Sequence, residues 1–209
     1  MDKGHAGHRR IAGVLLAAGG SVRLGKPKQL LPFGDRTLIE SALDTLLRSP
    51  VDEIIVVLGA HANEIAPLVQ HPRVRIVLNP DWEQGQSASL RAALDALPPD
   101  CDAVLFAPCD MPWITPELMA ELIRAWQQTG KPVVVTAAGE KRGVPALFAR
   151  ATFAELRAAS GDQGGRGLLQ KHPDLVAEVV VEPELLADID TPEEYQRVLE
   201  QLHQRSKRE

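Results

Sequence analysis

A glycine-rich loop that directly follows an apolar segment is the feature that most constrains this chain. Residues 11–18 form an almost unbroken apolar run, typical of a parallel strand covered on both faces. Gly19 and Gly20 come next, and glycine allows a close backbone approach in which successive N–H groups face an anion. Three cationic side chains follow: Arg23, Lys26 and Lys28. Each cation alone could equally be a solvated surface residue, but together with the glycines they predict a loop that binds phosphate.

Two familiar phosphate-binding motifs do not fit this loop. Residues 20–27 have the spacing of a P-loop, but Pro27 stands where a Ser or Thr should bind magnesium. Proline supplies neither the hydroxyl nor the backbone N–H of that motif. The glycines at 19, 20 and 25 also miss the G-x-G-x-x-G spacing of a dinucleotide-binding fold. The loop therefore belongs to another class.

The rest of the chain alternates between strand and helix patterns at the spacing of βαβ units. Strands are predicted at 53–58, 74–78, 103–107, 133–136 and near 177–181, with a further apolar segment at 145–148. Helices are predicted at 37–48, 62–69, 87–97, from 115–117 onward, at 152–159 and at 192–204. We expect one three-layer α/β domain with a mostly parallel sheet over residues 11–203, between a flexible tail at 1–10 and a second tail at 204–209.

Composition narrows the class of protein. The 209 residues carry a net charge of −5, which gives no general attraction for nucleic acid. No apolar stretch approaches the ~20 residues of a membrane span. The two cysteines and the absence of a signal-peptide pattern in the first ten residues favour a cytoplasmic protein without a disulfide framework.

Carboxylates follow two of the predicted elements. Asp110 comes just after the strand at 103–107, between two prolines, and could bind a divalent cation or merely stabilise a turn. Asp188 and Asp190 precede the last helix and would share one side of an extended segment, although a helix-capping role accounts for this region as well. Because ligands of open α/β sheets lie at the carboxyl ends of the strands, we expect one cleft between these carboxylates and the glycine-rich loop.

Residues 16–32 resemble the signature L-A-A-G-x-S-x-R-[ML]-G-x-x-K-x-L-L-P of the molybdenum cofactor cytidylyltransferase-like nucleotidyltransferases. The resemblance implies a Rossmann-like nucleotidyltransferase domain. It also implies that the loop wraps a nucleoside triphosphate, through Leu16, Ala17, Ala18, Gly19, Gly20 and Ser21. Arg23 would contact the phosphates and Lys28 the α-phosphate.

Other segments extend the same resemblance. Residues 109–112 (Cys-Asp-Met-Pro) are similar to the family's metal loop and 188–194 to its closing phrase, which implies Mg²⁺, or Mn²⁺ in its place, on Asp110 and Asp190. The segment 84–90 places Gly85 and Ser87 beside the nucleoside, and Ser87 is also a predicted helix N-cap. The segment 161–166 implies that Arg166 binds the acceptor's phosphate. Val144 departs from the family, which often carries histidine there.

The implied reaction transfers CMP from CTP to the terminal phosphate of molybdopterin cofactor and releases pyrophosphate. Ala18 favours CTP, since the guanylyltransferases have glycine at this position and the added methyl group narrows the base pocket. The implied partners are CTP, the molybdopterin acceptor and a molybdenum hydroxylase. The alternatives are a guanylyltransferase, a nucleotidyltransferase for a sugar phosphate or another small phosphorylated acceptor, and a non-catalytic molybdenum cofactor carrier or insertion chaperone.

Overall fold

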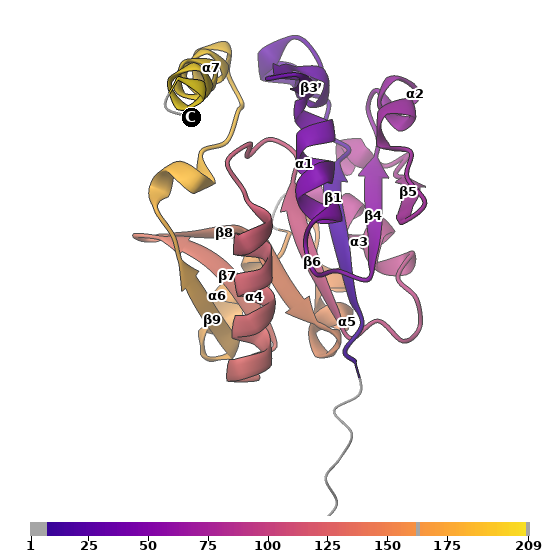
Figure 1. Ribbon diagram of the computed structural model, residues 1–209. Coiled ribbons are helices and arrows are strands. Elements are labelled where there is room, and N and C mark those ends of the chain that lie inside the picture. The colour runs from indigo at the N-terminus through magenta and orange to yellow at the C-terminus, as the bar shows by residue number, and fades with distance from the viewer. Residues whose placement is uncertain (1–7, 162–163, 208–209) are drawn as a thin grey trace, which may run out of the picture.

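The computed structural model describes residues 8–161 and 164–207, and its centre is a seven-stranded sheet (Figure 1). In spatial order the strands are β5 (Val74–Leu78), β4 (Glu53–Leu58), β1 (Ile11–Ala17), β6 (Ala103–Pro108), β8 (Lys141–Ala149), β7 (Val133–Ala138) and β9 (Val176–Val180). All neighbouring pairs are parallel except those of β8, which runs antiparallel to both β6 and β7. The prediction of a mostly parallel sheet is confirmed.

Helices cover both faces of this sheet and complete the three layers (Figure 1). One face packs against α1 (Leu38–Leu47) and α4 (Pro116–Thr129), and the other against α3 (Gln86–Asp95), α5 (Phe153–Ala158) and α6 (Arg166–Lys171). The short α2 (Ala62–Ile65) and the long α7 (Pro192–Ser206) lie toward the carboxyl ends of the strands. This is the Rossmann-like, three-layer arrangement that the resemblance implies.

The central strand β1 explains why its sequence is apolar throughout. Successive side chains of a strand point to opposite faces, so Leu15 enters the core under α1 and α4, while Val14 enters the core under α3 and α5. Both side chains are fully buried. A strand with helices on both faces has no solvent-facing side on which a polar residue could lie.

A third, smaller core lies above the carboxyl ends of the strands and involves α7. It joins the hairpin β2 (Pro32–Phe33) and β3 (Arg36–Thr37) to α7 through buried side chains that include Leu31, Trp113 and Ile189. The hydroxyl of Tyr195 on α7 donates a hydrogen bond to the Pro32 carbonyl at 2.7 Å. This packing holds the segment before α7 next to the glycine-rich loop.

Most predicted elements are confirmed, with differences at their ends. Helix α3 begins at Gln86 and its N-cap is Gly85 (φ 93°), so the prediction of Ser87 as N-cap is wrong. The predicted helix at 62–69 is α2 followed by a 3₁₀ turn, and α7 continues through Ser206 into the predicted tail. Residues 8–10 are docked, since Arg10 pairs with Asp100 at 2.9 Å, whereas the rest of the predicted N-terminal tail and residues 208–209 lie outside the described residues.

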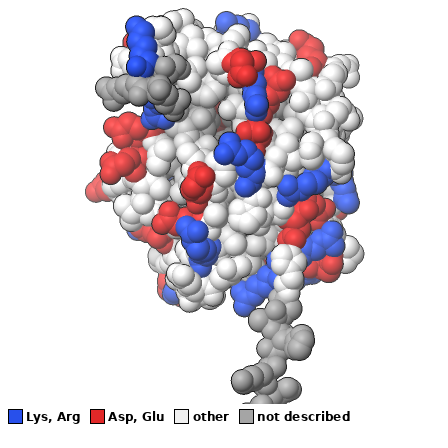
Figure 2. All heavy atoms as spheres, viewed as in Figure 1, with Lys and Arg blue, Asp and Glu red and all other residues white. Residues whose placement is uncertain are grey.

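The visible face of the molecule carries charges of both signs. Figure 2 shows acidic and basic side chains interspersed over the visible face, with no extended field of one sign. Among the helices of the described residues, none combines the length and the apolar character that crossing a bilayer requires.

Candidate functional site

The glycine-rich loop is held in shape by two of its own polar side chains. Gln29 is fully buried, and its Nε2 donates to the carbonyls of Ala17 at 2.9 Å and Gly19 at 2.8 Å. Ser21 adopts φ 55°, and its Oγ accepts a hydrogen bond from the backbone N–H of Lys28 at 2.9 Å. These bonds fold the loop back on itself immediately before Lys28.

The Gln29 contacts also orient the backbone of the loop. In a trans peptide the C=O and the N–H point in opposite directions, so the N–H of Gly20 points away from Gln29. Within the part of the chain that the structure describes, this N–H donates to no other group. An anion in the cleft could therefore accept from it. Gln29 is absent from the residues singled out by sequence, because a glutamine beside a predicted phosphate-binding lysine carries no signal of burial.

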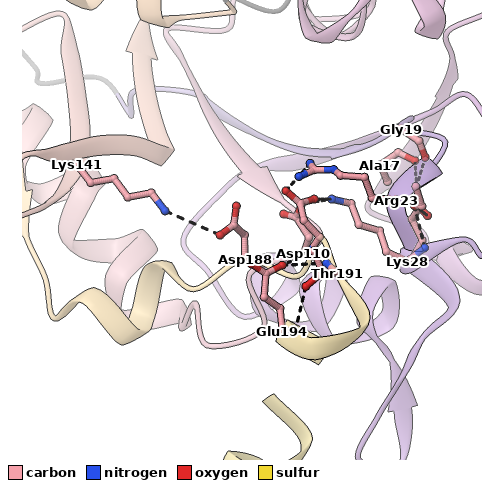
Figure 3. A network of polar contacts seen from close by, with 12 residues as sticks. Ala17, Gly19, Arg23, Lys28, Asp110, Lys141, Asp188, Thr191 and Glu194 are labelled. Atoms are coloured by element: carbon pink, nitrogen blue, oxygen red, sulfur yellow. Dashed lines mark hydrogen bonds and ion pairs between the residues drawn. The ribbon is translucent and has the colours of Figure 1, made fainter. Parts of the chain in front are cut away.

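Four charged side chains from three separate loops meet at the carboxyl end of the sheet (Figure 3). The Nζ of Lys28 contacts Asp110, in the loop after β6, and Asp190 Oδ1 at 3.0 Å, in the segment before α7. The guanidinium of Arg23 reaches Asp190 Oδ2 at 2.7 Å. A backbone hydrogen bond of 3.0 Å from the N–H of Ile189 to the Asp110 carbonyl joins the two acidic segments. The carboxylates and the glycine-rich loop, which the sequence places in one cleft, thus meet at Lys28.

Burial and charge act in opposite directions on these groups. Burial is the largest influence on Lys28 and lowers its pKa, but Asp110 and Asp190 outweigh it and raise the pKa above its usual range. For Asp190, burial raises the pKa, and the contacts with Lys28 and Arg23 bring it below its ordinary value. Lys28 therefore stays an ammonium and Asp190 a carboxylate across the neutral pH range.

The cluster lies in a cavity of about 570 Å³. Eleven of the residues selected from sequence line it: Leu16, Ala17, Ala18, Gly19, Gly20, Arg23, Lys28, Gly85, Asp110, Arg166 and Asp190. Ser21 borders a smaller hollow of about 270 Å³ that Arg23, Lys28 and Asp190 also line. The predicted collection of these loops into one cleft is what the structure shows.

Three of the sequence-selected residues lie elsewhere. Ser87 is fully buried, and its Oγ donates to the Gly161 carbonyl, so its hydroxyl does not face the cavity. Lys26 lies over the ring of Tyr195, 5.7 Å from the ring centroid. Asp188 approaches Lys141 at 3.9 Å, apart from Lys28 and Arg23 (Figure 3). Of the 161–166 loop, residues 162 and 163 lie outside the described residues.

The cavity also has a wall that sequence reasoning missed. Trp82, which follows β5, lines it together with Gly85 and Ser89. Trp82 was not singled out from the sequence, because contact with the glycine-rich loop more than sixty positions earlier leaves no local pattern.

The two carboxylates fit a divalent cation. Oxygens of Asp110 and Asp190 converge on one point, where the Lys28 ammonium now lies between them. Carboxylate oxygens are the ligands that Mg²⁺ and Mn²⁺ prefer, and Mg²⁺ takes one or two of them with phosphate and water completing the shell. A metal held only by protein would need more ligands, and among the described residues no cluster of three or more His, Cys, Asp or Glu side chains supplies them.

Cys109, the neighbour of Asp110, takes no covalent role in this arrangement. Burial raises the pKa of its thiol to about 12, so it stays neutral and a poor nucleophile. It lines the cavity as a small packing group.

Known proteins are similar to this chain in sequence and in fold. Residues 13–176 match the MobA-like NTP transferase domain. A protein named nicotine blue oxidoreductase from Paenarthrobacter nicotinovorans is 34% identical over 90% of this chain and 96% of its own length. The molybdenum cofactor cytidylyltransferase of Escherichia coli K12 is 24% identical over 87% of this chain and 92% of its own length.

Solved structures of related proteins have a similar fold. The crystal structure of Rv0371c from Mycobacterium tuberculosis H37Rv has a TM-score of 0.81 at 32% identity and covers 92% of this chain and 98% of that one. A structure of Rv0371c in complex with manganese has a TM-score of 0.75 at 30% identity over the same shares of the two chains. With its signature loop, its sheet and its match over residues 13–176, the chain belongs to the family of MobA-like NTP transferase domains.

Proposed function

We propose that this protein transfers CMP from CTP to the terminal phosphate of molybdopterin cofactor and releases pyrophosphate, with Mg²⁺ as the metal. The observation that carries the proposal is the convergence of Lys28, Arg23, Asp110 and Asp190 in one cavity beside the glycine-rich loop. A site for a metal-bound triphosphate needs both signs of charge at one place, cations for the phosphates and carboxylates for the metal.

Ion pairs within the site would exchange partners when the nucleotide binds. Two cations and two carboxylates neutralise one another in the described state. The triphosphate would take over Lys28 and Arg23 as partners, which frees Asp110 and Asp190 for the metal. When bound there, Mg²⁺ would supply charge neutralisation on the phosphate oxygens.

The residues differ in burial, and this suggests how they share the work. The Lys28 side chain is only 16% exposed and contacts two carboxylates, which suits an ammonium that holds the α-phosphate. The Arg23 side chain is 70% exposed at the rim, which suits contact with the pyrophosphate that must leave. Arg166 lines the same cavity and offers its guanidinium to the acceptor's phosphate.

No general base is required for this reaction. A terminal phosphate of the acceptor is already ionised near neutral pH, and attack on the α-phosphorus depends on positioning and charge. The lining of the cavity, as far as the chain is described, contains no histidine.

Ala18 supports CTP as the donor. Its side chain is 4% exposed in the cavity wall, so the methyl group takes space that glycine would leave open. One such contact is worth about 1–3 kcal/mol, enough to favour a pyrimidine by roughly 10- to 200-fold.

A second candidate function, that of an oxidoreductase, is included in the test because of the name of one relative. The relative from Paenarthrobacter nicotinovorans, at 34% identity, is named an oxidoreductase. The glycine-rich loop lacks the dinucleotide-binding spacing, and this favours the transferase.

The test incubates the purified protein with Mg²⁺, CTP, GTP, ATP or UTP in turn, and either molybdopterin cofactor or a sugar phosphate, and follows pyrophosphate. A separate assay follows the oxidation of NADPH. CTP should give the fastest release and a cytidine dinucleotide product of the expected mass. Asp110→Ala should lower the rate by about 100-fold or more while its circular dichroism spectrum is unchanged. Pyrophosphate release only with a sugar phosphate, or substrate-dependent NADPH oxidation without pyrophosphate, would refute the proposal in favour of the named alternatives.

A further inference from the structure

The indole of Trp82 forms part of the wall of the main cavity, and two glycines leave room for it. A Cβ atom on Gly20 would lie 2.9 Å from Cζ3 of the indole, and one on Gly59 would lie 2.6 Å from the Trp82 Cβ. Side chains at either position would collide with Trp82, so both positions leave the space that the indole fills. Trp82 thereby touches the glycine-rich loop and the end of β4 from its own place after β5.

The cavity has three regions that can be told apart by their charge. Lys28, Arg23 and the two carboxylates mark the region for phosphate and metal. Arg166, next to Val144, marks a second region whose positive charge suits an anionic acceptor. A third part of the wall includes Trp82, Gly85 and Ser89, and Glu83 is the charged residue beside them in the sequence that also lines the cavity.

This third region suits a neutral planar ring. A carboxylate at Glu83 disfavours phosphate there, whereas it can accept hydrogen bonds from an exocyclic amine. An indole offers a flat, polarisable surface to a ring, and Gly85 leaves the backbone open to close approach. Phosphate, acceptor and base would then each have one region of the same cavity.

We propose that Trp82 contacts the nucleobase of the bound nucleotide and helps to determine its specificity. This inference rests on the proposed binding of CTP at the site, though not on the identity of the acceptor. Trp82 adjoins the ends of β1 and β4, whereas Val144 of the acceptor region lies on β8, beyond β6 in the sheet. Removing the indole should therefore weaken base binding and enlarge the base subsite.

Intrinsic tryptophan fluorescence can detect the contact between Trp82 and the base. The chain has three tryptophans; Trp113 and Trp126 are only 6% and 5% exposed in the core, while Trp82 lines the cavity. Saturating CTP with Mg²⁺ should quench the wild-type emission, and Trp82→Phe should abolish most of that quenching while binding CTP within about threefold of wild type. Trp126→Phe, which removes an indole on α4 in the opposite helix layer, is the matched control and should keep the quenching.

Binding affinities distinguish a contact between Trp82 and the base from a role of Trp82 in supporting the glycine-rich loop. By calorimetry, Trp82→Ala should weaken CTP binding by between about 5- and 150-fold, the range found when a base loses an aromatic partner. The same variant should bind Mg²⁺-tripolyphosphate within about twofold of wild type, because that ligand has no base. Its preference for CTP over GTP should also shrink.

Each outcome bears on the inference. Full quenching in Trp82→Phe, unchanged CTP affinity in Trp82→Ala, or an equal loss for CTP and tripolyphosphate would overturn it, and the last would make Trp82 a support for the loop alone. If Trp82→Ala does not fold, the Trp82→Phe quenching result decides. A protein that binds CTP in this way but transfers no CMP to a molybdopterin acceptor would refute the proposed function without contradicting this inference.

Discussion

Removing the Lys28 ammonium tests how strongly the two carboxylates depend on it. In Lys28→Met, Asp110 and Asp190 keep their positions but lose the cation between them. Their side chains are only 18% and 26% exposed, so water replaces the ammonium incompletely. Two like charges then face each other in a partly buried site, and the folded state should lose stability.

The magnitude follows from the geometry. At the 3.0 Å separation of Lys28 Nζ and Asp190 Oδ1, an effective dielectric constant of about 20 gives a gross attraction of about 5–6 kcal/mol. Desolvation of the ammonium offsets much of this, and breaking a buried pair costs about 3–5 kcal/mol net. Since these groups are partly exposed, we expect a loss of about 2 kcal/mol, which for a chain of this size lowers Tm by about 4–8 °C.

Urea and thermal unfolding in the presence of EDTA measure this loss. Lys26→Met is the matched control, because the Lys26 side chain is exposed, and it should stay within about 0.5 kcal/mol of wild type. Adding Asp110→Asn to Lys28→Met should restore part of the stability, since it removes one of the two repelling charges. Mn²⁺ should raise the Tm of Lys28→Met more than that of wild type, because no ammonium competes for the oxygens.

The reasoning fails if Lys28→Met is as stable as the Lys26→Met control. It fails as well if the double variant is less stable than Lys28→Met, because the two carboxylates would then not repel each other.

Three further predictions follow from the same geometry. In the transferase assay, Asp190→Asn should lower the rate by about 10- to 100-fold, while Asp188→Asn, its neighbour outside the cluster, should stay within about threefold; equal effects would contradict the choice between them. Cys109 and Cys101 are buried and their pKa values are raised by burial, so both thiols should resist iodoacetamide at pH 8 until urea unfolds the protein, and rapid native labelling by mass spectrometry would refute this. The lowered pKa of Asp190 contributes stability that is present above its unfolded value of about 3.9 and is lost as pH falls through the folded value. The Tm difference between wild type and Asp190→Asn should therefore persist at pH 7, decline as the pH falls below about 4, and vanish only below the folded pKa.

The fold was largely predictable because its signals are local. A strand buried on both faces is apolar along its whole length, and Thr37, Thr115 and Thr191 mark the starts of α1, α4 and α7 as side-chain caps. The direction of β8 was not predictable, since periodicity carries no information on strand direction. The apolar segment at 145–148 is the end of a longer strand that β7 reaches through a tight turn at Gly139, whose φ is 59°.

The site was predictable to the extent that it follows strand ends. Asp110 comes immediately after a recognisable strand, so its place in the cleft could be predicted from the chain. The choice of Asp190 over Asp188 depends on the backbone bond between Ile189 and Asp110 and on the packing of α7, which are long-range contacts. Ser87 was misplaced because the helix begins one residue earlier and turns that hydroxyl inward.

Gln29 and Trp82 show what sequence reasoning alone misses. Gln29 acts through carbonyls at Ala17 and Gly19, and no motif distinguishes a glutamine that lies beneath a loop from one that lies in solvent. Trp82 is fitted to glycines that are distant along the chain, so its role is visible only when the three strand ends are assembled.

The most direct test of the whole account is a crystal structure of the protein with CTP and Mn²⁺, with the metal located by its anomalous scattering. The account predicts one Mn²⁺ peak bound by Asp110 and Asp190, the α-phosphate beside the Lys28 ammonium and Arg23 turned from Asp190 to the outer phosphates. A peak away from those two carboxylates, or phosphates bound away from residues 19–28, would contradict it.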